Sequence, residues 1–303
     1  MDKMAIPVIL DTDIGTDIDD TWALCFLSKC PELDLQLVTT CTGDTTYRVL
    51  LVAKILEALG MGNVPIALGP RESSNWGPQA AFVHEYSIEN YPGLVMDDAA
   101  ASIVDTIRSS RHHPVTILGI GPLRNIASAL EKDPTITEQA KYVGMQGSLR
   151  KGYGGSPAPS IEYNVAKDPV SCRKVFNAGW DVTITPLDTC GTVRLEGPRY
   201  VKIIDADTPT CSILIENQEI WSWCTNARSR IDPAAITSTL FDTVAVCLCF
   251  TERFFTMETV GISVGNDGFT AIDPESPIRV RSATKWRDQG GFLDLMVDRL
   301  SSR

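Results

Sequence analysis

The chain has 303 residues, of which 44% are hydrophobic and 21% charged, with a formal net charge of −11. This length and hydrophobic content predict one large α/β unit with a substantial core. The negative charge argues against nucleic acids and anionic membranes as partners, because both repel an acidic surface. No apolar run reaches the length of a membrane span, and the first residues do not resemble a signal peptide.

The nine cysteines lie mostly in apolar stretches and form no C-x-x-C pair. Neither a zinc site nor a disulfide framework is therefore indicated. Buried free thiols are typical of proteins in a reducing compartment, so we expect a cytoplasmic location.

Short apolar strands alternate with helical patterns along the chain. We expect strands at residues 6–10, 35–40, 64–68, 115–118, 142–145 and 182–185, with helices at 19–27, 46–59, 97–109, 123–130 and 169–178. Helical regions at 209–227 and 233–250 follow, then strands near 257–264 and 278–280 and a closing helix at 290–300. The alternation predicts a mainly parallel sheet with helices on both faces, a Rossmann-like α/β fold forming a single domain over residues 1–303.

Two long irregular segments, residues 71–93 and 147–164, each lie between an expected strand and the helix after it. Long loops in a compact domain are commonly lids or binding loops.

The most informative segment is residues 8–20, where an apolar strand runs into Asp11, Asp13, Asp17, Asp19 and Asp20. Carboxylates this close repel one another unless a cation lies among them, and oxygen ligands favour Ca²⁺ or Mg²⁺. Helix capping would explain the later aspartates but not the first two. Because open α/β sheets build their sites where strands end, we predict a metal-dependent active site here.

A metal-dependent phosphohydrolase is one alternative. An apolar strand followed by Asp-x-Asp is similar to haloacid-dehalogenase-like phosphatases, in which the first aspartate is the nucleophile. That type needs a later lysine and a distant acidic pair, whereas Asp19 and Asp20 follow at once in this chain.

The chain resembles the nucleoside N-ribohydrolases of the inosine–uridine-preferring type. The similar blocks follow in order at residues 11–20, 39–45, 119–127, 145–147, 162–169 and 241–242. The aspartate block and the Glu162-Tyr163-Asn164 block are the most specific. The resemblance implies hydrolysis of the N-glycosidic bond of a ribonucleoside to ribose and free base, in purine or pyrimidine salvage, by a homo-oligomer (dimer or tetramer).

The resemblance also implies a bound Ca²⁺ held by Asp13, Asp20, the backbone carbonyl of Ile120, and Asp242. Water bound to this cation would ionise more readily, and Asp13 would act as the general base that takes its proton.

Further side chains are implied to bind the nucleoside. Ribose contacts are expected from Asp19, Asp44, Glu162, Asn164 and Asp242. Asp11 is expected to orient the loop without binding the metal.

Phe241 departs from the family pattern, since members carry a histidine there that assists departure of the base. His84 is the only obvious replacement acid, although a structural role is equally open to it. Stacking on the base is open to Trp76, Tyr86, Trp221, Trp223 and Phe241. The missing histidine also leaves a second alternative, a nucleoside- or ribose-binding protein with little turnover.

Overall fold

The structure is a computed structural model that describes residues 4–225, 232 and 234–302. Its ten-stranded sheet has the order β4-β3-β2-β1-β5-β6-β7-β10-β8-β9. The strands are β1 (Ile6–Thr12), β2 (Leu33–Thr40), β3 (Ile66–Leu68), β4 (Val95–Met96), β5 (Val115–Gly119), β6 (Ala140–Met145), β7 (Val182–Thr185), β8 (Phe255–Val264), β9 (Thr270–Ile272) and β10 (Arg279–Trp286). All neighbours from β4 to β10 pair in parallel, and β8 and β9 continue the sheet antiparallel.

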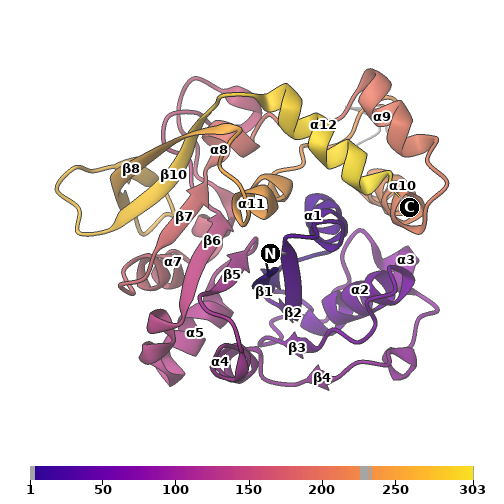
Figure 1. The fold of residues 1–303 in the computed structure, drawn as a ribbon, viewed down its shortest axis with the longest axis horizontal. Coiled ribbons are helices and arrows are strands. Elements are labelled where there is room, and N and C mark those ends of the chain that lie inside the picture. Colours follow the sequence, from indigo (N-terminus) through magenta and orange to yellow (C-terminus); the bar gives the residue numbers. More distant parts are fainter. Residues whose placement is uncertain (1–3, 226–231, 233, 303) are drawn as a thin grey trace.

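Helices cover both faces of the sheet, as the alternation of strands and helices predicts (Figure 1). The α-helices are α1 (Asp19–Ser28), α2 (Thr45–Ala58), α3 (Ala80–Val83), α4 (Ala99–Ser109), α5 (Arg124–Lys132), α6 (Tyr163–Lys167), α7 (Pro169–Phe176), α8 (Leu187–Cys190), α9 (Gly197–Ile204), α10 (Pro209–Cys224), α11 (Asp242–Leu248) and α12 (Gln289–Leu300). Short 3₁₀ turns lie at Ile88–Asn90, Pro134–Glu138 and Tyr153–Gly155. None of the helices in the described part of the chain is long and apolar enough to cross a membrane.

Strand β1 lies between two hydrophobic cores. Val8 and Leu10 belong to the core under α1, α2, α11 and α12, whereas Ile9 belongs to the core under α4, α5 and α7. Successive residues of a strand point to opposite faces, so a continuous apolar run is what a doubly covered strand requires.

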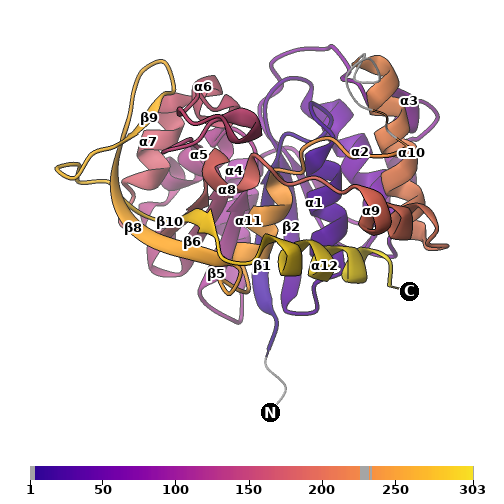
Figure 2. The same cartoon turned by 90° about the horizontal axis from the view of Figure 1, so that it is seen from above.

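The order of the strands reverses at β1. The chain adds β2, β3 and β4 on one side of β1 and then adds β5, β6 and β7 on the other. In Figure 2 the N-terminus lies at the bottom and α6 at the top, at the edge where the parallel strands end. In open α/β sheets, ligands bind at this edge, beside the point where the order of the strands reverses.

The expected helix at residues 233–250 is wrong for most of its length. Among the described residues of that segment, only Asp242–Leu248 is an α-helix. The backbone N–H groups of Thr237 and Leu240 donate instead to Leu195 and Val193, at 3.0 and 2.8 Å. The expected helix at 209–227 is present as Pro209–Cys224, and its last two residues lie outside the described part.

Candidate active site

The loop between β1 and α1 places the aspartates. The hydroxyl of Thr12 donates to Asp20 at 2.5 Å and accepts the backbone N–H of Ile14 at 3.0 Å, which joins the end of β1 to the first turn of α1. Gly15 has φ +98°, and a Cβ there would lie 2.6 Å from both Leu51 and Tyr47. Only glycine therefore fits this turn.

The side chain of Arg48, in α2, binds the backbone of this loop. Its buried guanidinium donates to the carbonyl oxygens of Asp13 and Ile14, the latter at 2.6 Å, and to the hydroxyl of Thr16 at 2.9 Å. The arginine thus satisfies backbone acceptors of the loop, and its hydrogen bonds to the loop go to carbonyl and hydroxyl oxygens and to none of the carboxylates. The sequence analysis did not identify this residue, because it lies within the helical pattern of α2, which follows β2.

Asp19, Asp20 and Asp242 form a buried cluster. One carboxylate oxygen from each lies within 4.8 Å of the others, and the residues are 5%, 3% and 2% exposed. Burial first, and then repulsion between neighbouring carboxylates, raises the pKa of all three well above its usual range. Such an all-oxygen set of buried like charges fits a hard divalent cation, which would offset the repulsion.

One cavity of about 370 Å³ contains this cluster. Its acidic part is completed by Asp13, Asp17 and Glu162, and its other lining residues are mainly apolar or aromatic. The full lining is Asp13, Thr16, Asp17, Asp19, Asp20, Ile120, Met145, Tyr153, Glu162, Tyr163, Asn164, Trp221, Thr225, Phe241 and Asp242. Asp13 and Ile120 therefore share the cavity with the cluster, although the carboxylate of Asp13 lies outside the close group of three.

Glu162 and Asn164 line the cavity from the start of α6. Glu162 accepts the backbone N–H groups of Gly147, Asn164 and Val165 at 3.0, 2.7 and 3.1 Å. Burial raises its pKa to about 7 in spite of these bonds. The side-chain amide of Asn164 donates to the carbonyl oxygens of Ile120 and Met145, both at 3.2 Å, and so connects α6 to the ends of β5 and β6.

Asp11 lies behind the cavity and is not part of its lining. Its carboxylate accepts Thr39 at 2.5 Å and Asn125 at 2.8 Å, and burial raises its pKa to about 7. These contacts tie the end of β1 to β2 and α5.

The structure does not bring Asp44 or His84 to the cavity. Asp44 caps α2 by accepting Thr46 and pairs with Arg71 at 2.9 Å. His84 is exposed at the end of α3 and is not among the lining residues. Neither a capping carboxylate nor an exposed loop histidine can be told from a site residue by composition alone.

Only Trp221 and Phe241 of the proposed stacking residues line the cavity. Trp76 stacks on Tyr47 with ring centroids 5.6 Å apart, and Tyr86 donates to Glu57. Sequence reasoning missed Tyr153 and Tyr163 as lining residues, although both lie in the long irregular segment 147–164.

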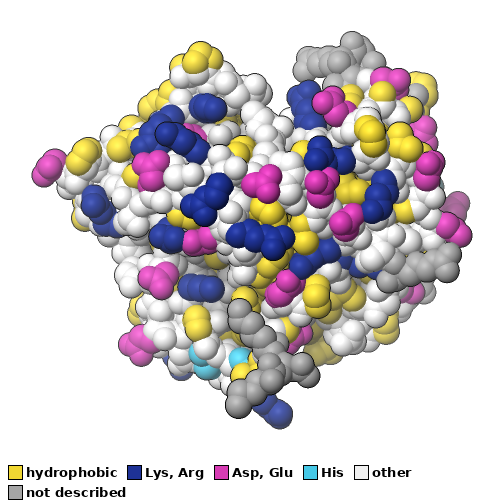
Figure 3. Space-filling view, turned by 45° about the horizontal axis from the view of Figure 1, so that its top comes forward, with side chains coloured by type: hydrophobic (Ala, Val, Ile, Leu, Met, Phe, Trp, Pro, Cys, Tyr) yellow, Lys and Arg dark blue, Asp and Glu magenta, His cyan; other side chains and the backbone are white. Residues whose placement is uncertain are grey.

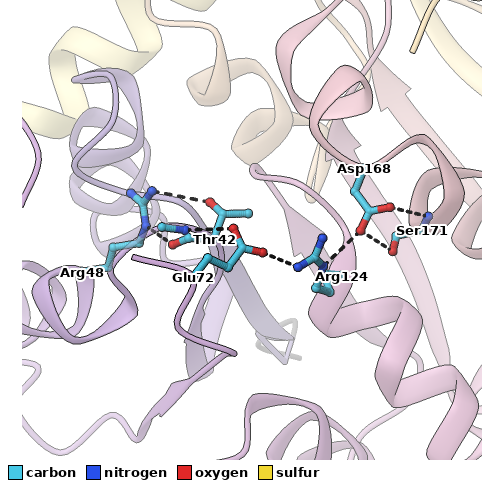
Figure 4. A network of polar contacts seen from close by, with 7 residues as sticks. Thr42, Arg48, Glu72, Arg124, Asp168 and Ser171 are labelled. Atoms are coloured by element: carbon cyan, nitrogen blue, oxygen red, sulfur yellow. Dashed lines mark hydrogen bonds and ion pairs between the residues drawn. The ribbon is translucent and has the colours of Figure 1, made fainter. Parts of the chain in front are cut away.

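A chain of polar contacts runs across the same edge of the sheet (Figure 4). Arg124, at the start of α5, pairs with Glu72 in the first long loop and with Asp168, 3.2 Å away, which caps α7. Glu72 accepts the backbone N–H of Gly43 at 3.3 Å. Arg124 thus connects the first long loop to the segment that follows Asn164.

Comparison with known proteins yields consistent matches. Residues 8–290 match the sequence profile of a family described as inosine-uridine preferring nucleoside hydrolase. A non-specific ribonucleoside hydrolase, RihC, from Escherichia fergusonii is 32% identical over 208 residues, which are 65% of this chain and 66% of that protein. The alignment therefore spans just under two thirds of this relative. The pyrimidine-specific ribonucleoside hydrolase RihA from Salmonella paratyphi B is 27% identical, over 98% of this chain and 99% of that protein.

Solved structures show the same fold. The plant nucleoside hydrolase PpNRh1 superposes with a TM-score of 0.81 at 22% identity, over 98% of this chain and 99% of that one. At this identity the likeness concerns the fold alone.

Proposed function

Because this chain belongs to the inosine-uridine preferring nucleoside hydrolase family, we propose that it hydrolyses the N-glycosidic bond of ribonucleosides. One observation carries the proposal: a single cavity joins a buried carboxylate cluster to an aromatic wall. Carboxylates and a cation suit the polar sugar, and aromatic rings suit the flat base.

We propose Ca²⁺ as the cofactor, held by Asp20, Asp242, Asp13 and the carbonyl oxygen of Ile120. Three or more clustered carboxylates favour Ca²⁺, which takes six to eight oxygen ligands, over Mg²⁺, which is usually bound through one or two carboxylates and several waters. When bound, the cation would lower the pKa of a coordinated water molecule, and its positive charge would hold the sugar hydroxyls.

Asp13 is the proposed general base. It lines the cavity, and Arg48 holds its backbone carbonyl group. Burial raises the pKa of Asp13, which makes it a better acceptor for the proton of an attacking water. The surrounding carboxylates stabilise the positive charge that develops on the sugar as the bond breaks.

The sugar is proposed to contact Asp19, Asn164, Asp242 and Glu162. All four line the cavity, and Asn164 is oriented by carbonyl oxygens at the ends of two strands. We do not retain Asp44 as a sugar contact or His84 as an acid, because neither lines the cavity.

The phosphohydrolase alternative is disfavoured by two observations. Asp11, which would be its nucleophile, is fully buried behind the cavity. Among the described lining residues there is also no lysine, arginine or histidine to hold a phosphate. A cytoplasmic location, a role in salvage and a homo-oligomeric state stay predictions.

The test is release of free ribose from a panel of purine and pyrimidine ribonucleosides, with and without a calcium chelator. We expect release from at least one nucleoside, its loss with the chelator and its return with added Ca²⁺. Calcium binding without release from any nucleoside would indicate a binding protein and contradict the proposal. Release of phosphate from phosphate esters would indicate the phosphohydrolase.

A further inference from the structure

A buried polar layer connects the helices that carry two different parts of the cavity lining. Helix α1 begins with Asp19 and Asp20 of the carboxylate cluster, whereas α10 carries Trp221 of the aromatic wall. That wall consists of Tyr153, Tyr163, Trp221 and Phe241. Helix α10 packs against α1, α2 and α3 (Figure 1). The polar layer, whose members are at most 1% exposed, consists of Thr21, Gln79, Asn217 and Gln218.

Gln79 is the centre of this polar layer. Its side-chain amide donates to the hydroxyl of Thr21 at 2.8 Å and to the side-chain oxygen of Asn217 at 2.9 Å. Thr21 directly follows Asp20 in the chain. Asn217 lies one helical turn before Trp221, on the same face of α10. One amide group therefore connects the helix that carries the carboxylates with the helix that carries the tryptophan.

The backbone of Gln79 is itself held in place. Its N–H donates to the hydroxyl of Tyr47 at 3.0 Å, and that hydroxyl donates to the carbonyl oxygen of Gly15 at 3.4 Å, in the loop between β1 and α1. Tyr47 also stacks on Trp76, which lies shortly before Gln79 in the first long loop. Because the backbone of Gln79 is bound to the aspartate loop, its side chain can hold α10 at a defined distance from that loop.

The polar layer is not the arrangement that stability alone would favour. Gln218 accepts the indole N–H of Trp22 at 3.3 Å. However, Oε1 of Gln79, Nε2 of Gln218 and Nε1 of Trp221 are buried and have no hydrogen-bond partner among the described residues. A buried polar atom without a partner costs free energy, which an apolar contact of the same shape would avoid. Apolar attraction is non-directional, whereas a hydrogen bond has a preferred geometry, so the polar layer fixes how α10 lies against α1.

We propose that Gln79 is a positioning residue of the nucleoside site, which holds Trp221 at the distance from the carboxylate cluster that a bound nucleoside requires. The inference rests on the proposed function, in which the cluster binds the sugar and the aromatic wall binds the base.

The position of Gln79 defines what its loss should change. Gln79 does not line the cavity, so it acts through α10 and not by contact with the substrate. Without its hydrogen bonds, Trp221 should contact the base less well, because the helix that carries the ring is held less firmly. The sugar and the calcium ion are bound by other elements, so their binding should change little.

The test replaces both partners of one hydrogen bond by apolar side chains, in the double variant Gln79→Met and Asn217→Leu of the calcium-loaded full-length protein. Because neither partner of that bond is left unpaired, we expect Tm to stay within about 3 °C of the wild-type value. KM for the best-hydrolysed nucleoside should rise about tenfold and kcat should fall by less than about threefold, since the ring contacts the base before and during the reaction. The inhibition constant of free ribose, which has no base, should change by less than about twofold.

Two further variants separate position from stability. Tyr91→Phe removes another buried hydrogen bond of the first long loop, which the hydroxyl donates to the carbonyl oxygen of Val64, and should leave KM within about twofold of the wild-type value. Trp221→Leu removes the ring itself, so the double variant introduced into that background should raise KM no further. An equal rise of KM in both backgrounds would overturn the inference, and so would a ribose inhibition constant that rises as much as KM.

Fluorine NMR measures the placement of Trp221 without turnover. The protein is labelled with fluorotryptophan, and the resonance of Trp221 is identified by its loss in Trp221→Phe. We expect Gln79→Met, which changes no residue of α10, to shift this resonance and Tyr91→Phe to leave it in place. If the wild-type protein releases ribose but neither this resonance nor KM changes, the inference is overturned while the proposed function stands. If no nucleoside releases ribose, the proposed function fails, and the resonance alone decides whether Gln79 positions Trp221: a shift supports it and an unchanged resonance overturns it.

Discussion

Arg48 holds the aspartate-rich loop through its backbone carbonyl groups and not through its carboxylates. The guanidinium donates to the carbonyl oxygens of Asp13 and Ile14 instead of to the acidic side chains. Buried carbonyl groups need donors, and here one cation supplies several of them. The carboxylates of the cavity consequently stay available to a bound cation and a sugar.

The roles of Asp13 and Asp242 can be separated by substitution. Asp13→Asn should lower kcat by about 10²- to 10⁴-fold, because an amide cannot accept the proton of water. It should weaken calcium binding less than Asp242→Asn does, because only Asp242 belongs to the close group of three carboxylates. Ribose release gives kcat, and calorimetric titration gives the calcium affinity.

Circular dichroism of both variants serves as the control for folding. Normal turnover in Asp13→Asn would remove Asp13 from the mechanism. Equal loss of calcium in the two variants would mean that Asp13 acts mainly as a ligand.

At the scale of elements, the site depends on loops that the sheet alone does not fix. The first long loop contacts the aspartate loop closely: a Cβ on Gly77 would lie 2.2 Å from the carbonyl oxygen of Gly15. Arg124 then connects this loop, through Glu72, to Asp168 at the start of α7 (Figure 4). Two sides of the candidate site are thus joined by one arginine.

Arg124→Met should loosen the first long loop with little effect on global stability. Exposed ion pairs contribute about 1 kcal/mol or less, so we expect the free energy of unfolding to change by less than about 1 kcal/mol. Because the first long loop would be held less firmly, we expect KM to rise by about two- to fivefold. Hydrogen exchange in residues 70–79 should become faster. Arg108→Met is the matched control, because Arg108 forms a comparable exposed pair with Asp133. A KM equal to that of the control would show that the connection does not organise the site.

The elements that the sequence predicted well are those with strong local signals. The central strands and their helices follow from apolar runs and caps, and the aspartate block is at the end of β1, as expected. The segment before Asp242 was predicted as part of a helix, but its backbone pairs with Val193 and Leu195, far away in the chain. Long-range pairing of this kind leaves no local pattern, and the same reason hides Arg48 and the Tyr153 ring.

At the scale of the whole molecule, the net charge of −11 is not spread evenly. On the face in Figure 3, acidic and basic side chains are interspersed with hydrophobic ones. The cavity, in contrast, has carboxylates without any basic side chain in its described lining. The protein therefore gathers carboxyl groups without basic partners in a buried site, where a bound cation has a large effect.

This arrangement predicts how pH and calcium act on stability. The folded-state pKa of Asp19, Asp20 and Asp242 is raised well above the usual value, and that of Asp11 and Glu162 is raised to about 7. Between about pH 4 and pH 7 the unfolded chain has released protons that the folded metal-free protein still holds. Because the unfolded state then binds fewer protons, the free energy of unfolding of the metal-free protein falls as pH rises through this range.

Calcium should reverse the trend, since it replaces protons on the same oxygens and binds more tightly as they ionise. We expect the increase in Tm caused by a fixed excess of Ca²⁺ to be small at about pH 5 and to grow towards about pH 7.5. Thermal unfolding at several pH values, with chelator or with Ca²⁺, measures both curves. Asp242→Asn removes one carboxylate of the cluster and should flatten the calcium-dependent curve, whereas Arg108→Met should leave it unchanged. A calcium effect that is independent of pH would contradict a site built from these buried carboxylates.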